Sequence, residues 1–91
     1  MVEQVQLIIS GEVQGVSYRW CAVRKAKELG LKGYVRNISS GEVEIVAEGE
    51  RSLLMELAYW AWEGSPAAEV RDVKERWSEA THRWQSFHIA P

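Results

Sequence analysis

The chain has 91 residues, a length typical of one domain, and we expect residues 1–91 to form a single domain. Hydrophobic residues make up 46% of the chain and charged residues 26%, values typical of globular and not of disordered proteins. The net charge of −2 argues against a polycation that coats nucleic acid or anionic lipid. One cysteine excludes an internal disulfide, no run approaches the ~20 apolar residues of a membrane span, and the N-terminus lacks the basic start of a signal peptide. These features indicate a soluble cytoplasmic protein.

The first half of the chain is predicted to form a strand, a helix and a hairpin. Val5, Leu7 and Ile9 alternate with polar residues, the period-2 pattern of a strand with one buried face. From Tyr18 onward apolar residues recur at helical spacing, and Gly30 stands where a left-handed C-cap ends a helix. Two strands joined by a tight Ser-Ser-Gly turn follow, over residues 31–38 and 43–47.

The second half is predicted to form a helix and two strands. Residues 51–63 carry an inward stripe of leucines and alanine, and Gly64 to Pro66 end the helix because proline cannot continue it. Strands are then expected over residues 68–77 and 84–89. This order predicts an α+β ferredoxin-like sandwich, with two helices packed on one face of a mostly antiparallel four- or five-stranded sheet.

Charge is unevenly distributed along the chain. Six cations and one acid stand between Tyr18 and Arg36, a net charge of +5. Seven glutamates and one arginine stand between Asn37 and Glu69, a net charge of −6. The first predicted helix is therefore basic on an acidic protein, which fits either a solvated helix face or an anion-binding site.

The segment GEVQGVSYR, from Gly11 to Arg19, places a glycine-containing turn between a strand and a helix. The free N–H groups of such a turn, the positive end of the helix and the two-donor fork of Arg19 together suit a phosphate. Gly15 lets the backbone approach an oxyanion with no Cβ in the way. The alternative is an ordinary strand-to-helix turn, and the segment is not a Walker A loop because no Gly-Lys-Ser/Thr follows.

Asn37 ends the second predicted strand, just before the hairpin turn. Asparagine in such a place is commonly a turn residue, because it bonds to its own backbone and tolerates left-handed geometry. The functional alternative is that its carboxamide holds a water molecule. The spacing alone leaves both interpretations open.

Together these two segments resemble the acylphosphatase family. GEVQGVSYR matches the G-x-V-Q-G-V-x-[FY]-R loop of that family at every defined position. A second family signature follows a Gly-aromatic pair, here Gly33 and Tyr34, and is matched at Asn37, Gly41, Val43 and Gly49. The segment GSPAAEV, residues 64–70, resembles the stretch after the second helix of the family. The resemblance covers essentially the whole chain.

The resemblance implies hydrolysis of the carboxyl–phosphate bond of an acyl phosphate to carboxylate and inorganic phosphate, with phosphate as product or inhibitor. Arg19 then binds the phosphate and Asn37 orients the attacking water. The other substrate-binding residues, acting through backbone amides, are Gln14, Gly15, Val16, Ser17 and Tyr18. No metal and no other cofactor is expected, because an acyl phosphate is already activated and charge neutralisation with one fixed water supplies most of the barrier reduction.

Two other functions fit the same fold class. Ferredoxin-like sheets also bind RNA, but the strands around Leu7 and Ile45 show no exposed aromatic residues, so no nucleic-acid partner is expected. The other possibility is a degenerate accessory domain, as occurs at the front of larger carbamoyl-phosphate-using maturation enzymes. The start at Met1 and the end shortly after the last strand favour a free-standing protein, which we expect to be a monomer without membrane association.

Outside the motifs, packing or solvated roles are expected for Cys21, His82, His88, Glu42 and Glu44. Cysteine phosphatases need an arginine six residues after the cysteine, where this chain has Lys27. The two histidines lack partners at metal-ligand spacing. Trp20, next to Arg19, is expected to pack partly under loops, and the alternatives are an apolar wall for the acyl group or a weak association surface.

Overall fold

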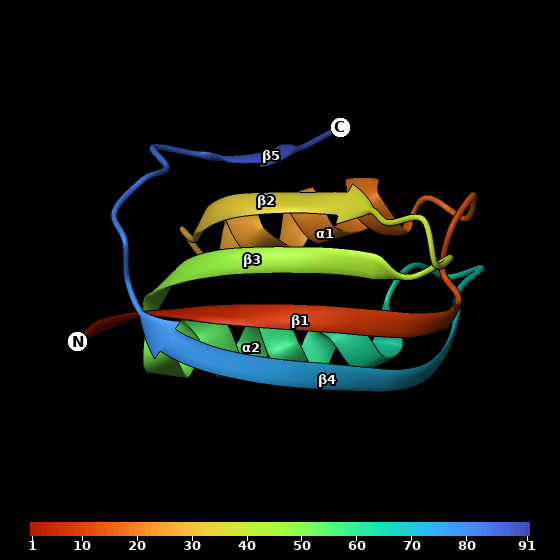
Figure 1. The fold of residues 1–91 in the computed structure, drawn as a ribbon, viewed down its shortest axis with the longest axis horizontal. Helices are drawn as coiled ribbons and strands as arrows, with labels where there is room; N and C mark the ends of the chain where they lie inside the picture. The colour runs from red at the N-terminus through yellow and green to blue at the C-terminus, as the bar shows by residue number, and fades with distance from the viewer.

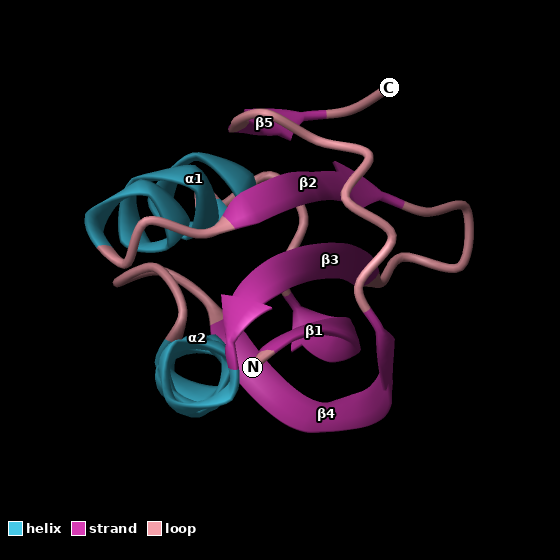
Figure 2. Ribbon diagram, turned by 90° about the vertical axis from the view of Figure 1, so that its left-hand side faces the viewer, coloured by secondary structure: helices cyan, strands magenta, loops and turns pink.

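The computed structural model describes residues 1–91 as two helices packed on one five-stranded sheet (Figures 1 and 2). The elements in chain order are β1 (Val2–Glu12), α1 (Tyr18–Glu28), β2 (Lys32–Asn37), β3 (Val43–Glu50), α2 (Arg51–Glu63), β4 (Glu69–Glu79) and β5 (Phe87–Ile89). The strand order is β4-β1-β3-β2-β5, and only the β2–β5 pair is parallel. The predicted ferredoxin-like sandwich is therefore confirmed. No helix is long and apolar enough to cross a bilayer.

The core lies between the sheet and the two helices. Val5, Leu7 and Ile9 of β1 are fully buried on the helix-covered face, as their alternation predicts. The helices close this layer through small and aliphatic residues at helical spacing. Those of α1 are Ala22 and Ala26, and those of α2 are Leu54, Leu57, Ala58 and Ala61. The predicted inward face of each helix is thus the one that packs on the sheet.

Each helix ends shortly before a glycine, as the sequence predicts. Gly30 after α1 adopts a left-handed conformation with φ 70°, and α2 ends at Glu63, just before Gly64 with φ 68°. A Cβ on Gly64 would strike the ring of Tyr18, so this glycine also allows a close approach between the end of α2 and the start of α1.

The last predicted strand is wrong in its extent. β5 covers only Phe87–Ile89, whereas the sequence predicts a strand from residue 84. Residues 80–86, here called the strap, instead pass from β4 to β5 around the left-hand end of the sheet in Figure 1, on the side away from the helices (Figure 2). Trp84 leaves the strand pattern because its ring packs edge-on against Tyr34, with the ring centroids 5.6 Å apart.

The expectation that Glu44 is solvated is also wrong. Its carboxylate is buried on the uncovered face of β3 and accepts hydrogen bonds from Gln6 Nε2 at 2.7 Å and Arg36 Nε at 2.6 Å. Burial by itself raises the pKa of Glu44, but the hydrogen bonds from Gln6 and Arg36 and the Arg36 charge outweigh it and lower the pKa. Strand alternation predicts the face of this glutamate but not the donors that gather over it.

The strand directions bring two loops to one end of the sheet. β1 and β2 both run antiparallel to β3, so the C-terminal ends of these two strands lie at the same end of the sheet. The β1–α1 loop therefore lies beside the β2–β3 turn, at the right-hand end of Figure 1. These are the two segments that the sequence singles out.

Candidate active site

The β1–α1 loop has a backbone suited to holding an anion. Gly15 and Ser17 both adopt left-handed conformations, with φ 75° and 65°. Ser17 is the N-cap of α1, yet its side chain makes no capping hydrogen bond. The amides of residues 14–17 donate to no backbone acceptor within the protein. Unpaired amides in such a concave turn, at the positive end of a helix, are a natural anion cradle.

Arg19 stands in the first turn of α1, beside this cradle. It is half-buried and forms no ion pair or hydrogen bond with the protein. It lines a hollow of about 120 Å³ together with Gly15, Ser17 and Trp20. A guanidinium without a protein partner at a helix N-terminus is available for a bidentate contact to phosphate.

Trp20 and the C-terminal strand also border the cradle. The Trp20 side chain is 57% exposed and, like Ile89 of β5, lines the same hollow. Packing under a loop is therefore not its main environment. The structure instead places the apolar side chains of Trp20 and Ile89 in the same hollow as the unpaired Arg19 guanidinium. An apolar wall for the acyl group, the alternative interpretation of Trp20, would lie there.

The Gln14 side chain connects the two loops. Its Nε2 donates to the backbone oxygens of Ile38 and Glu42, both at 2.9 Å. The β2–β3 turn is closed in addition by Ile38 N–H donating to Glu42 O at 2.9 Å. The sequence indicates a role for the backbone of Gln14 but gives no sign of this side-chain bridge, because both acceptors are backbone atoms more than twenty residues away.

Asn37 lies at the end of β2, paired with Val43 of β3. By alternation it shares the helix-covered face with Val35, the side on which α1 and the cradle lie. Its Oδ1 is buried and accepts no hydrogen bond from the protein. An unpaired buried acceptor is rare in folded proteins, so this oxygen is available to a partner from outside the protein, such as a water molecule.

Comparisons with known proteins agree with this geometry. The family model described as Acylphosphatase matches residues 5–89. The chain belongs to the acylphosphatase family. It is 42% identical to the acylphosphatase of Shewanella amazonensis, over 97% of each chain. The structure of acylphosphatase from Bacillus subtilis superposes with a TM-score of 0.94 at 33% identity and covers all of both chains. Full-length HypF also matches, with a TM-score of 0.90 at 29% identity, but over only 12% of its own length.

The cradle of this acylphosphatase family member is fixed to the end of α2. Ser65 Oγ donates to Val16 O at 2.6 Å, and the buried Tyr18 hydroxyl donates to Ala61 O at 2.8 Å. Burial raises the pKa of Tyr18, so its hydroxyl stays protonated and remains a donor. Ser65 is a support that the motif analysis missed, although the Gly-Ser-Pro segment that contains it carries a visible family signal.

The site residues predicted from the sequence fall into two groups: some hold the loop in place, and others line the hollow beside Arg19. Val16 and Tyr18 hold the loop in place, and the Gln14 side chain points to the hairpin rather than to a ligand. Gly15 and Ser17 line the hollow beside Arg19. β2 ends with Asn37 at the same end of the sheet, and the Gln14 side chain bonds the hairpin turn that follows it to the cradle loop.

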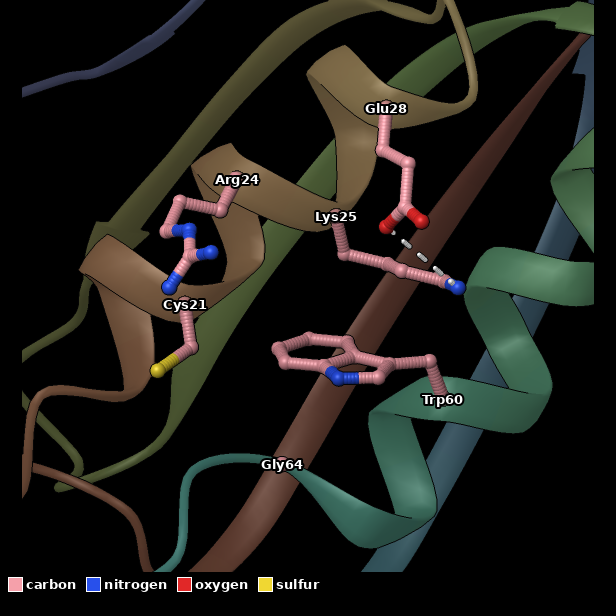
Figure 3. A pocket seen from close by; sticks show the side chains of 6 residues that line it. All are labelled: Cys21, Arg24, Lys25, Glu28, Trp60 and Gly64. Carbon is pink, nitrogen blue, oxygen red and sulfur yellow. Dashed lines mark ion pairs between the residues drawn. The ribbon is translucent and has the colours of Figure 1, made fainter.

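A larger hollow of about 380 Å³ lies between the helices, lined by Cys21, Arg24, Lys25, Glu28, Trp60 and Gly64 (Figure 3). Its cations are already engaged. Lys25 Nζ faces Glu28 Oε2 at 3.7 Å, and the Arg24 guanidinium lies 5.0 Å from the centroid of the Trp20 ring. Because neither cation is free, this inter-helix groove is less suited to a phosphate than the small cradle.

Proposed function

We propose that this chain is an acylphosphatase that hydrolyses acyl phosphates to carboxylate and inorganic phosphate. The observation that carries the proposal is the unpaired Arg19 guanidinium beside a turn of free amides, in a chain of the acylphosphatase family. Family membership supports the class of substrate, and the free donors support the place where its phosphate binds. On this proposal residues 1–91 act as one catalytic domain, as a monomer, in the cytoplasm.

The chemistry needs charge stabilisation more than acid–base catalysis. The oxygen of a water molecule attacks phosphorus, the bond from phosphorus to the acyl oxygen breaks, and the bonding electrons leave with a carboxylate. Arg19 and the amides of residues 14–18 stabilise the charge on the phosphoryl oxygens. The Asn37 carboxamide orients the water, whose proton passes to the phosphate. Because the leaving carboxylate is stable, no metal is required to activate it.

The test is hydrolysis of benzoyl phosphate with chelator present, and p-nitrophenyl phosphate as the stable phosphomonoester control. We expect Arg19→Lys and Asn37→Ala each to lower kcat by at least about a hundredfold, the scale for removing one preorganised transition-state donor. Lys27→Ala is the matched control, because Lys27 is an exposed cation on the same helix that does not line the hollow beside Arg19.

Inhibition by inorganic phosphate separates the two roles. Arg19→Lys is expected to weaken it, because a point ammonium lacks the two-donor fork. Asn37→Ala is expected to leave it unchanged, because the water and not the phosphate contacts this residue. Near-normal hydrolysis by either folded variant refutes the assignment, and loss of activity on adding chelator refutes metal independence.

A further inference from the structure

A second hollow lies on the face of the sheet that the helices leave uncovered, the face toward the reader in Figure 1. Its volume is about 360 Å³, within the range of small-ligand pockets. It shares no lining residue with the cradle. We call it the sheet-face pocket.

Strand register builds the floor of the sheet-face pocket. Arg76 of β4 stands opposite Gln6 of β1, and Gln6 stands opposite Val46 of β3. Val46 in turn stands opposite Tyr34 of β2, so one row of side chains crosses four strands. Neighbouring strands lie about 4.8 Å apart, so the row spans about 14 Å. Val46 has the shortest side chain of this row and lines the hollow between Gln6 and Tyr34.

The strap forms the wall of the pocket, and Glu48 fixes the strap. Glu48 is a buried residue of β3, and its carboxylate accepts hydrogen bonds from Thr81 N–H at 2.6 Å, Thr81 Oγ1 at 3.0 Å and His82 N–H at 2.9 Å. His82 adopts a left-handed conformation with φ 58°, which is uncommon outside glycine. This turn carries Arg83 and Trp84 to the rim, where Trp84 meets Tyr34 edge-on.

Of the polar side chains that line the pocket, Gln6, Tyr34 and Thr81 donate hydrogen bonds to buried glutamates, but others keep groups that the protein does not use. Arg76 and Arg83 are exposed and form no ion pair. The nearby carboxylates of Glu44 and Glu48 accept hydrogen bonds from other residues instead. Gln4, in the next row of the floor, has a buried Oε1 that accepts no hydrogen bond. Two free guanidinium groups, two aromatic rings and an unpaired carboxamide therefore meet in one hollow.

We propose that the sheet-face pocket binds an aromatic phosphate ester of mononucleotide size. Two guanidinium groups complement the oxygens of a phosphate monoester, which offers more acceptors than a carboxylate. The Trp84 and Tyr34 rings provide a surface for a planar base. The Gln4 carboxamide matches the exocyclic amine and ring nitrogen of an adenine edge. This site goes beyond the proposed hydrolase function and does not depend on it.

The test is an NMR titration of the ¹⁵N-labelled protein with AMP as the probe. Adenosine supplies the ring without the anion, and inorganic phosphate supplies the anion without the ring. We expect saturable AMP shifts at the Trp84 indole and around residues 76–84, with weaker binding of both part-ligands. Shifts confined to residues 14–19, or no saturation at about 10 mM, near the weak limit of specific binding, overturn the proposal.

Variants separate this pocket from general electrostatic attraction. Arg76→Ala and Arg83→Ala are each expected to weaken AMP binding by about tenfold, the usual effect of losing one charge-assisted hydrogen bond. Lys74→Ala is the matched control, because Lys74 is an exposed cation on the same face of β4 but does not line the pocket. Equal losses in all three variants overturn the proposal, as does tighter binding of a single-stranded oligoadenylate than of AMP.

Discussion

Replacing Gln14 by methionine tests whether the bridge between the two loops supports turnover. Methionine keeps nearly the length and shape of the side chain but removes both Nε2 hydrogen bonds to Ile38 and Glu42. Each such bond contributes about 0.5–1.5 kcal/mol net, and the lower end applies here because the bridge is solvent-exposed. The docked arrangement of the loops therefore loses about 1–1.5 kcal/mol in Gln14→Met.

The size of the kinetic effect follows from this loss. A change of 1.4 kcal/mol is about a factor of ten in an equilibrium, so the ratio of docked to undocked loops falls by up to about tenfold. Because the Gln14 side chain makes the only side-chain hydrogen bonds between the two loops, we expect the undocked form to predominate once it is replaced, and kcat for benzoyl phosphate to fall toward that factor. Inhibition by inorganic phosphate stays near its original strength, because the amides of residues 15–18 are unchanged.

A matched variant controls for loss of stability. Gln6→Met removes a glutamine amide that donates to Glu44 at 2.7 Å on the opposite face of the sheet, away from the cradle. Urea denaturation is expected to show losses of about 1 kcal/mol for both variants, but only Gln14→Met slows turnover. If folded Gln14→Met keeps kcat within about twofold of the parent, the bridge does not align Asn37 and the reasoning is wrong.

Three further predictions concern stability and the cradle. Tyr18→Phe is expected to lower the unfolding free energy by about 1–2 kcal/mol in urea denaturation, because the buried Ala61 carbonyl oxygen loses the hydroxyl that donates to it. The raised pKa of Tyr18 also makes the unfolding free energy of the parent fall above pH about 10, the unfolded tyrosine pKa, and this fall is expected to be weaker in Tyr18→Phe. The lowered pKa of Glu44 adds to the unfolding free energy above its unfolded pKa of about 4.3, and this contribution is lost as pH falls. In Glu44→Gln the unfolding free energy is therefore expected to depend less on pH in the acid range. The same acid dependence in the variant and the parent contradicts this. Gly15→Ala and Gly30→Ala each place a Cβ on a left-handed residue in open space, and each is expected to lower the unfolding free energy by about 1 kcal/mol. Only Gly15→Ala is expected to weaken inhibition by phosphate. Equal inhibition constants for the two variants contradict the cradle.

Local signals predict the two helices and the strand–turn–helix junction at Arg19 well. The apolar stripe beginning at Tyr18 and the segment Arg51–Glu63 carry helical spacing together with a glycine stop, and both helices form there. Arg19 is found beside free amides because a strand–turn–helix junction is itself a local feature. Where the pattern of a few neighbouring residues determines the geometry, the sequence is a sufficient guide.

Long-range polar pairing is what the sequence pattern does not reveal. Glu44 and Glu48 alternate as solvated strand residues would, yet both are buried by donors 33–38 residues away or by Arg36 on the neighbouring strand. The strap is missed for the same reason, because its path is set by the Glu48 carboxylate and not by its own propensity. A pattern with a period of two shows which face a side chain occupies but not what covers that face.

The left-handed conformation of Ser17 is a local feature that depends on long-range hydrogen bonds. A non-glycine residue with φ 65° costs about 1–2 kcal/mol, and no sequence rule places that cost at this serine. The strain persists because tertiary bonds hold the loop on both sides, through Ser65 to Val16 and through Gln14 to the hairpin. In this conformation the amides of residues 14–17 have no backbone acceptor in the protein, and Gly15 and Ser17 line the hollow beside Arg19. On the proposed function, the anion site therefore consists chiefly of strained backbone, and the side chains that hold the strain matter as much as those expected to face the ligand.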